Sequence, residues 1–154
     1  MPEERTVAEE AKPYVIFRLG DEEFGVDVMS IKEIAKITTI TRVPHTPDFI
    51  EGITNLRGSL ATVINLRKRF GLESKEIDVD SRLIIAELEE KLVGMLVDAA
   101  TEVLRIPVSD IEAAPEMVTT EISKQYLRGM GKVENRLIIL LDLKQVLPEE
   151  EGGG

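Results

Sequence analysis

An internal repeat limits the possible folds of this chain more than any other feature. The segment FIEGITNLRGSLATVINLRKRF (Phe49–Phe70) aligns without gaps with YLRGMGKVENRLIILLDLKQVL (Tyr126–Leu147). Upstream, YVIFRLGDEEFGVDVMSIKEI, which starts at Tyr14, resembles RLIIAELEEKLVGMLVDAATEV, which starts at Arg82. Each half therefore carries the same elements in the same order, which indicates an ancient duplication.

Aligned positions in the repeat point to turns and to a common core. Identical residues occur at three aligned positions, namely Gly52 and Gly129, Leu60 and Leu137, and Leu66 and Leu143. Gly58 falls opposite Asn135, and these two residue types best tolerate positive φ. Both are therefore expected in tight hairpins. In the upstream segments Gly25 lies near Gly94.

Most elements are predicted to be strands. Val15, Phe17 and Leu19 lie on one face at period two, and Phe24, Val26 and Val28 do so after a turn at Gly20-Asp21. Near-continuous apolar runs, typical of strands covered on both faces, occupy Leu60–Leu66 and Leu137–Leu143. A hairpin around Glu89-Glu90 is expected from Leu83–Leu88 and Leu92–Val97.

Two short helices are also predicted. Ser30-Ile31-Lys32-Glu33 has the pattern of a capping box, which predicts about two helical turns through Ile37, with Ile34 and Ile37 facing the core. Thr46-Pro47-Asp48 predicts a second helix start, with Thr46 as the N-cap and Pro47 in the first helical position.

The composition favours β-structure. Aromatic residues make up only 4% of the chain and there is no Trp, so the core must be built from Ile, Leu and Val. Short strands with regular turn signals suggest barrels or a sandwich. Half-chains of about 65 residues would each be marginal alone, so the halves are expected to share a core. The predicted units are 14–80 and 81–147, between flexible tails at 1–13 and 148–154, and exchange of strands between the units stays open.

The charge and the cysteine content exclude several classes of protein. The net charge is -10, from 29 acidic and 19 basic residues, which disfavours binding to nucleic acid or to anionic lipid. The chain has no Cys, so it forms no disulfide, thiolate metal site or Cys nucleophile. The N-terminus has no apolar signal region, and no apolar run approaches the roughly 20 residues of a membrane helix. We therefore expect a cytoplasmic protein with no direct membrane insertion.

No set of reactive residues stands out in the sequence. We therefore expect no catalytic residues, no metal ligands and no cofactor. The single histidine, His45, is expected to be an ordinary loop residue. Asp98 and Asp142 each follow an apolar strand, and the simpler interpretation is that they cap turns by accepting bonds from backbone amides. The alternative is a carboxylate-based hydrolase that uses Asp98 or Asp142, which would need a pocket with two converging carboxylates. An RNA-binding barrel is disfavoured by the acidic balance and by the lack of stacking aromatic residues.

From about Tyr14 to Leu147 the chain resembles the CheW family of chemotaxis coupling proteins, and also the regulatory domain at the C-terminus of CheA kinases. The specific part is FxLGDEEFGVDVMSIKEI followed by TPDFIEGITNLRGSLATVINLRKRFG, with Asn55-Leu56-Arg57-Gly58 at its centre. The resemblance implies a mainly-β fold of two tandem five-stranded SH3-like β-barrels that share a hydrophobic core. It implies an adaptor without enzymatic activity that couples chemoreceptors to the histidine kinase CheA at receptor arrays on the inner face of the membrane. A scaffold in another sensory or motility pathway is the alternative.

The resemblance also implies site residues. Those expected to bind the receptor are Ile31, Glu33, Gly52, Asn55, Arg57 and Val103. Those expected to bind the kinase are Gly94 and Gly129.

Simpler structural interpretations remain open for most of these residues. Ile31 would belong to the core, Glu33 would be the acid of the capping box, and Gly52 would form a strand bulge. Packing is an equal alternative for Gly94, Val103 and Gly129. Arg57 has Glu134 as its counterpart in the second half, and this opposite charge suggests that Arg57 serves recognition rather than the barrel. A solvated hairpin arginine is the alternative.

Overall fold

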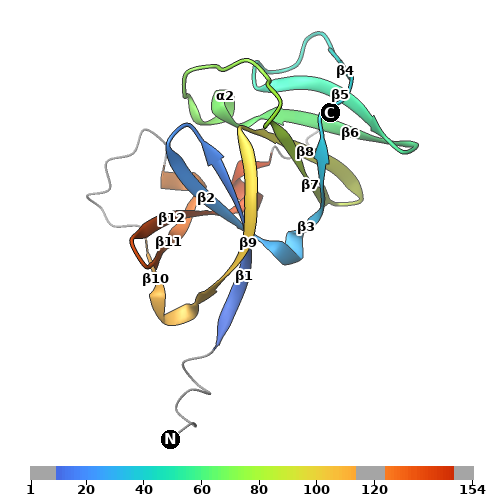
Figure 1. The fold of residues 1–154 in the computed structure, drawn as a ribbon. Coiled ribbons are helices and arrows are strands. Elements are labelled where there is room, and N and C mark those ends of the chain that lie inside the picture. Colours follow the sequence, from blue (N-terminus) through green and yellow to red (C-terminus); the bar gives the residue numbers. More distant parts are fainter. Residues whose placement is uncertain (1–9, 114–123, 148–154) are drawn as a thin grey trace, which may run out of the picture.

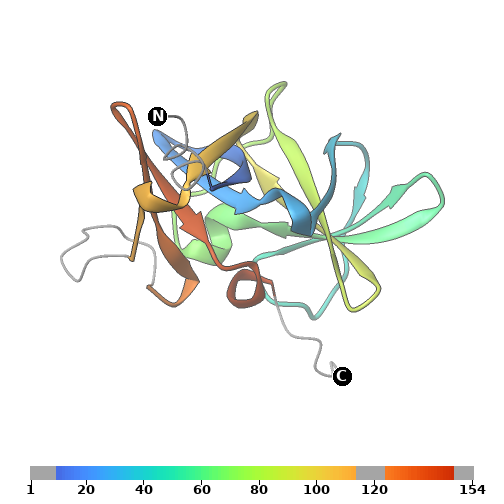
Figure 2. The same cartoon turned by 90° about the horizontal axis from the view of Figure 1, so that it is seen from below.

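A computed structural model describes residues 10–113 and 124–147. In this part of the chain the backbone forms two strongly curled β-sheets that lie side by side (Figures 1 and 2). The sheet that we call the first barrel has the strand order β3-β7-β8-β6-β5-β4, and the second barrel has the order β10-β11-β12-β2-β1-β9. The mainly-β prediction is confirmed. Each sheet has six strands among the described residues, one more than expected, because each includes a two-residue strand, β4 or β10.

The strands have the following bounds. The first barrel contains β3 (Ile31–Lys36), β4 (Ile40–Thr41), β5 (Ile50–Leu56), β6 (Ser59–Asn65), β7 (Arg82–Leu88) and β8 (Lys91–Val97). The second barrel contains β1 (Ala11–Leu19), β2 (Glu22–Asp27), β9 (Ala99–Pro107), β10 (Ile111–Glu112), β11 (Leu127–Val133) and β12 (Arg136–Leu141). Strand β1 begins inside the segment 1–13 that was expected to be a tail, and the rest of both expected tails, 1–9 and 148–154, lies outside the described residues.

Each sheet curls because its two outer strands are neighbours in the sequence. In the first barrel β3 and β4 stand at opposite ends of the strand order, yet only residues 37–39 separate them along the chain. In the second barrel β9 and β10 have the same relationship and are joined by the 3-10 turn η2 (Val108–Asp110). Such short connections bring the two edges of each sheet close together, which bends the sheet into a barrel.

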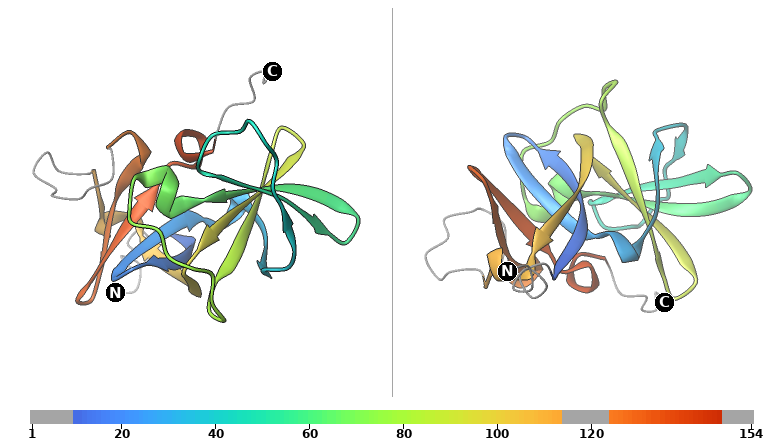
Figure 3. Two further views of the ribbon diagram at one scale, coloured as in Figure 1. Left: turned by 90° about the horizontal axis from the view of Figure 1, so that it is seen from above. Right: turned by 60° about the horizontal axis from the view of Figure 1, so that its bottom comes forward.

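The two halves of the sequence exchange their first hairpins. The β1–β2 hairpin comes from the first half but lies in the second barrel, where β2 pairs in parallel with β12 and β1 pairs with β9. The β7–β8 hairpin comes from the second half but lies in the first barrel, where β8 pairs in parallel with β6. Figure 3 shows the blue β1–β2 hairpin beside the orange and red strands of the second half. The chain passes between the barrels at the 3-10 turn η1 (Val28–Ser30) and again at Asp98.

One core spans both barrels. The largest buried cluster includes Phe17 and Phe24 of the second barrel together with Ile64 and Met95 of the first barrel. The rings of Phe17 and Phe24 stack with their centroids 5.5 Å apart. A buried seam of this kind agrees with the expectation that the two halves stabilise one another.

The predicted helix after Ser30 is wrong. Residues Ile31–Lys36 form strand β3, which pairs antiparallel with β7. The preceding turn η1 is capped by Asp27, whose carboxylate accepts from the N–H of Met29 at 2.9 Å, and not by Ser30. A two-turn helix is marginal by itself, so pairing with β7 decides the conformation. Ile34 consequently faces solvent instead of the core, whereas Ile37 does pack against buried residues.

The predicted helix start at Thr46 is also wrong. Residues 44–49 form turns, in which the Thr46 hydroxyl donates to the carbonyl of Val43 at 2.8 Å and the N–H of Ile50 donates to Pro47 at 3.0 Å. His45 has a φ of 63° in this loop, as a loop residue without helical neighbours can. The Thr46 hydroxyl thus bonds back to the preceding turn, and local side-chain bonds of this kind favour turns over helix.

Short helices instead follow the last strand of each half. Helix α2 (Leu66–Phe70) is capped by Asn65 and α3 (Leu143–Val146) by Asp142, which are aligned residues of the repeat. The Asp142 carboxylate accepts from the N–H of Lys144 at 3.1 Å. The predicted capping role of Asp142 is therefore confirmed.

Candidate functional site

The structure brings together two of the residues expected to bind the receptor, Glu33 and Arg57. Arg57 lies at the tip of the β5–β6 hairpin and donates from Nη2 to Glu33 Oε2 of β3 at 2.7 Å. The Arg57 side chain is 75% exposed and that of Glu33 is 27% exposed. An exposed ion pair of this kind contributes little to stability, because water and salt screen it. Both charges therefore remain accessible to a binding partner.

The tip that carries Arg57 is a two-residue turn held by Asn55. Arg57 and Gly58 both have positive φ, 51° and 94°, which matches the twist of a tight hairpin. The side-chain oxygen Oδ1 of Asn55 accepts from the N–H of Gly58 at 2.8 Å. Asn55 thus positions Arg57 through the turn. At the equivalent tip the positive φ (56°) belongs to Glu134, not to the expected Asn135.

Gly52 and Gly129 occupy equivalent bulges and are buried. The pairing of β5 with β6 shifts register between Ile50 and Gly52, and that of β11 with β12 shifts between Leu127 and Gly129. A Cβ atom at Gly52 would lie 2.1 Å from the carbonyl oxygen of Thr41, and one at Gly129 would lie 2.7 Å from that of Glu112. The bulge interpretation of Gly52 is confirmed. Both glycines allow close approach of the backbone of the short end strands.

Ile31 and Val103 lie on different barrels. Ile31 lies in β3, two residues before Glu33. Its side chain is half-buried and packs against the shared core. Val103 is exposed in β9 of the second barrel. Glu33 pairs with Ile85 in the first barrel, and Glu102 pairs with Ile16 in the second barrel. Ile85 and Ile16 hold equivalent positions in their hairpins, so Glu102 is the equivalent of Glu33. Val103 is therefore the equivalent of Ile34. Of the expected receptor residues, the structure brings Glu33, Asn55 and Arg57 together at the β5–β6 tip, whereas Val103 lies on the second barrel.

Gly94 is buried inside the β7–β8 hairpin. A Cβ atom there would lie 3.0 Å from Ile85 Cδ1, and at the equivalent Gly25 it would lie 3.0 Å from Leu140 Cδ2. Both glycines stand in a strand that pairs in parallel, β8 with β6 and β2 with β12. Any part that Gly94 plays in binding must act through the shape of its hairpin, because the residue offers no exposed side chain.

The second barrel has an ion-pair cluster that the sequence did not reveal. Arg136 donates to both carboxylate oxygens of Glu23 at 3.0 Å each and to Glu102 at 2.6 Å. The hydrogen bond from Arg136 holds the pKa of Glu23 below its usual value, and the two carboxylates raise the pKa of Arg136. Glu102 is the structural equivalent of Glu33, but its arginine lies at the start of β12, two residues after the position that matches Arg57. No local pattern could predict this contact, since its members are far apart in the sequence.

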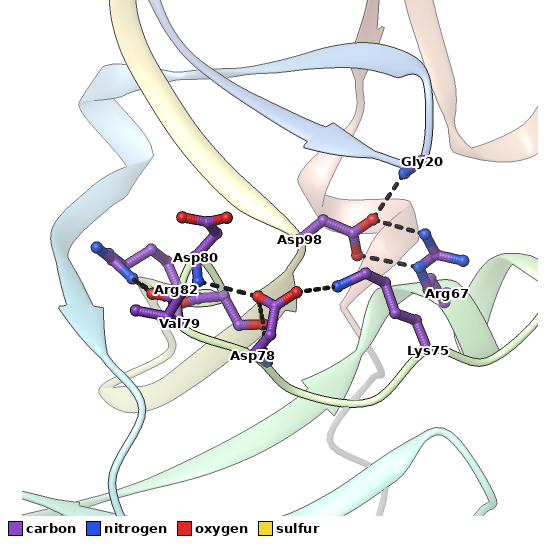
Figure 4. Close-up of polar contacts among 9 residues, drawn as sticks. Gly20, Arg67, Lys75, Asp78, Val79, Asp80, Arg82 and Asp98 are labelled. Atoms are coloured by element: carbon purple, nitrogen blue, oxygen red, sulfur yellow. Dashed lines mark hydrogen bonds and ion pairs between the residues drawn. The ribbon is translucent and has the colours of Figure 1, made fainter.

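A second ion pair joins the two barrels at Asp98 (Figure 4). Arg67 of α2 donates from Nε and Nη2 to the Asp98 carboxylate at 3.0 and 2.6 Å, and the N–H of Gly20 donates to Asp98 at 2.7 Å. Burial raises the pKa of Asp98, but the bonds from Arg67 and Gly20 outweigh it, so the pKa lies below its usual value. The predicted turn-binding role of Asp98 is confirmed, whereas its arginine partner was not foreseen.

The structure places Asp98 and Asp142 in different hydrogen-bonding environments. Asp98 is bound by Arg67 and Gly20, and Asp142 caps α3, so these carboxylates serve separate segments. Among residues 10–113 and 124–147, no group of three His, Asp or Glu side chains could hold a metal ion. No helix in this part of the chain is long and apolar enough to span a membrane. Asp98 and Asp142 therefore do not converge in one site.

These features define a class: a tandem β-barrel protein with an exposed, charged hairpin as its candidate binding site. Comparison with known proteins narrows the class. Residues 13–151 match the CheW-like domain family. The chain is 37% identical over 138 residues to the chemotaxis protein CheW of Klebsiella aerogenes, covering 90% of this chain and 82% of that one. It is 38% identical to that of Bacillus subtilis, with 88% and 86% covered.

A solved structure is similar in fold and sequence. It is the crystal structure of the scaffolding protein TtCheW from Thermoanaerobacter tengcongensis, with a TM-score of 0.79 and 41% identity over 86% of this chain and 89% of that one. The chain described here belongs to the CheW-like domain family. The predicted family and the pair of SH3-like barrels are confirmed.

Proposed function

We propose that the protein is the adaptor that couples chemoreceptors to the histidine kinase CheA in chemotaxis. Membership of the CheW-like family over nearly the whole chain is the observation that carries this function. The fold supports it, because a rigid body with two barrels offers separate surfaces to two partners. Holding both partners raises the local concentration of kinase at the receptors.

On the receptor side, the proposal assigns binding to the cluster around Arg57. The Arg57–Glu33 pair supplies exposed charges, and Ile31 supplies a half-buried apolar residue on the same strand as Glu33. Asn55 holds the tip of the hairpin, and Gly52 lies at the bulge of its first strand. A helical receptor tip can dock by apolar anchors on one face with charges at the margin. Val103 of the second barrel remains a predicted contact on a separate surface.

On the kinase side, the proposal assigns binding to barrel surfaces that Gly94 and Gly129 support. Both glycines are buried, so they act by keeping their hairpins in place. The protein itself would catalyse no reaction and would need no cofactor. It would work in the cytoplasm, at receptor arrays on the inner face of the membrane. A scaffold in another sensory or motility pathway is the second candidate, and it differs only in its partners.

A reconstituted mixture of receptor fragments in vesicles, CheA and this protein tests the function. Kinase autophosphorylation should rise when the protein is added together with receptor, and not when either is added alone. Equal kinase activity with and without the protein would contradict the adaptor role. Replacing the chemotaxis kinase and receptors with those of another sensory pathway from the same organism tests the second candidate.

A further inference from the structure

The β1–β2 hairpin completes a barrel whose other strands come from a remote part of the chain. It fills the position between β9 and β12 in the second barrel. Strand β1 pairs with β9 from Ala11 to Arg18, and β2 pairs in parallel with β12 from Glu23 to Gly25. Without this hairpin, β9 and β12 would each present an unpaired edge, and such edges readily accept a strand from another chain.

Within the described residues the hairpin is joined to the rest of the chain on one side only. The connection is η1, the three-residue turn that leads into β3 of the first barrel. None of its three residues is fully buried, and the side chain of Met29 is 84% exposed. The bonds that shape the turn are local, from the N–H of Met29 to Asp27 at 2.9 Å and from the N–H of Ile31 to the carbonyl of Val28. The connection therefore lies at the surface, where it can straighten.

The equivalent connection of the second half is held by contacts with both barrels. Met29 matches Asp98, because each lies four residues after the glycine that is common to the two hairpins, Gly25 or Gly94. The Asp98 carboxylate accepts bonds from Arg67 of α2 and from the N–H of Gly20 in the β1–β2 turn. Of the two passages between the barrels, η1 is therefore the one with the features of a hinge.

A second copy of the chain can supply every contact that the hairpin makes inside the protein. Phe17 and Phe24 of the hairpin belong to the core that spans both barrels, and Gly20 at its tip binds Asp98. A hairpin from another copy re-forms these contacts, because its sequence is the same. Only η1 changes, from a turn to an extended link. Four residue steps from Asp27 to Ile31 reach about 13 Å, so the two copies must meet at their η1 turns.

We propose that two copies of this chain exchange their β1–β2 hairpins through η1, so that each second barrel is completed by the other copy. A short link holds the hairpin near its own barrel at an effective concentration of about 1 mM, which favours the monomer in dilute solution. We therefore expect the dimer to form when the chain refolds at a comparable concentration. It should separate slowly on dilution, because release of a hairpin opens the core.

This inference goes beyond the proposed function, because the exchange needs no partner other than a second copy. Its consequence for the adaptor is bivalence. An exchanged dimer presents two Arg57–Glu33 pairs on one particle, which raises the avidity for receptors that are themselves clustered.

An engineered disulfide distinguishes hairpin exchange from association of two surfaces. Pro13 of β1 pairs with Arg105 of β9, and neither side chain is buried. Proline has no N–H for the ladder, so we expect the closely spaced type of pair, with Cα atoms about 4.5 Å apart, which a disulfide can bridge. The chain has no Cys that could compete. In P13C/R105C the disulfide joins residues of one chain in the monomer and of two chains in the exchanged dimer.

The full-length P13C/R105C variant is refolded from urea at about 1 mM, the effective concentration of the tether, and is then oxidised. Sedimentation measures the dimer, and a denaturing gel without reductant measures chains joined by a disulfide. We expect both to report the same fraction. Dimers that fall apart into single chains on the gel would show association of surfaces and would overturn the proposal. A chain that stays monomeric after refolding, or an equal yield of covalent dimer from R105C alone, would also contradict it.

A proline in η1 tests the hinge. M29P removes the N–H that Asp27 caps and disfavours a helical turn at Val28, so it should favour the extended link. We expect the dimerisation constant to rise about fivefold or more. The matched control is S109P in the middle of η2, which joins two strands of one barrel and should leave the constant within about twofold. Equal changes in the two variants would contradict the role of η1.

A longer link tests the hinge in the opposite direction. Insertion of Gly-Ser-Gly-Ser between Val28 and Met29 lets the hairpin fold back onto its own chain more easily, so the dimer fraction should fall. A dimer fraction that stays the same or rises would overturn the proposal. Exchange in a chain that binds neither receptor nor kinase would support the inference and contradict the adaptor function. Kinase coupling by a chain that never dimerises would support the adaptor function and contradict the inference.

Discussion

Arg67 and Asp98 form a two-point ion pair at the position where the chain passes from the first barrel to the second. Both side chains are only 17% exposed, so the pair is better protected from solvent than the Arg57–Glu33 pair. Asp98 also binds the N–H of Gly20 in the β1–β2 turn. Three segments that are remote in sequence are thus joined by one carboxylate.

Replacing Asp98 with Asn should destabilise the protein by about 1–3 kcal/mol, because it leaves a partly buried arginine without its charged partner. Urea unfolding of D98N and wild type measures the difference. The control is Asp21→Asn, in the turn that follows Gly20, which should change the stability by less than about 0.5 kcal/mol. Equal losses of unfolding free energy in the two variants would show that the Arg67–Asp98 ion pair does not stabilise the protein.

Stability should fall at acid pH because the carboxylates of Asp98, Glu23 and Asp78 have lowered pKa values. The pKa values of Asp98 and Glu23 lie below their usual values in the folded protein. Each therefore contributes stability that is fully present above its unfolded pKa, about 4, and is lost as pH falls through the folded pKa. Thermal unfolding between neutral pH and pH 2 measures this loss. The D98N variant should show a shallower decline below pH 4, and a decline as steep as that of the wild type would contradict the assignment.

Reversing the charge of Arg57 tests whether it serves recognition. R57E should weaken receptor binding about tenfold, because a like charge then faces Glu33 and the partner. The swap R57E/E33R restores an ion pair inside the protein. If Arg57 acts only through its ion pair with Glu33, the swap should restore binding. If Arg57 contacts the receptor, binding should stay weak. Lys36→Glu, at the end of the same strand as Glu33, controls for net charge.

Adding one methyl group at Gly52 should destabilise the first barrel. The new Cβ would lie 2.1 Å from the carbonyl oxygen of Thr41, and the φ of 147° is itself unfavourable for other residues. We expect G52A to lower the free energy of unfolding by about 2 kcal/mol or more. Gly58→Asn is the control, because its Cβ meets open space and Asn tolerates its positive φ. Weaker receptor binding by G52A without loss of stability would indicate a direct contact instead.

Arg69 connects the two halves, and its loss should loosen α3. Its guanidinium lies 4.5 Å from the ring centroid of Phe49 and 5.3 Å from that of Tyr126, and it donates to the carbonyls of Val146 and Gln145. Lys cannot reproduce the planar stacking together with both bonds. R69K should cost about 1–2 kcal/mol and should speed amide exchange in α3. Unchanged exchange in α3 would contradict this role.

Local pattern and the repeat predicted most of the architecture. The alternating strand through Val15, Phe17 and Leu19 and the hairpins around Gly20 and Glu89 were predicted correctly. In each hairpin a strand pairs with the next strand along the chain, so local pattern is enough to identify it. The segment after Ser30 was misassigned for the opposite reason. Its conformation depends on β7, which lies about 50 residues further along the chain, and a capping pattern cannot report a partner at that distance.

The sequence predicted residues of the candidate site, but it did not predict the contacts between them. Glu33 and Arg57 were both expected, yet their ion pair depends on where β3 and the β5–β6 hairpin meet. The Arg136 cluster gave no signal in the sequence, because the exchange of hairpins brings Glu23 to it and Glu102 lies 34 residues away along the chain.

The exchange of hairpins between the two halves has a consequence for the ancestral single repeat. A single ancestral repeat would have possessed a β1–β2 type hairpin that its own remaining strands do not pair with. It would have closed a barrel only by borrowing the hairpin of another copy, as domain-swapped dimers do. Fusion of two such genes would have freed the copies to diverge, as they have where the second barrel pairs Arg136 with Glu23 and the first barrel has Ser59 and Leu92.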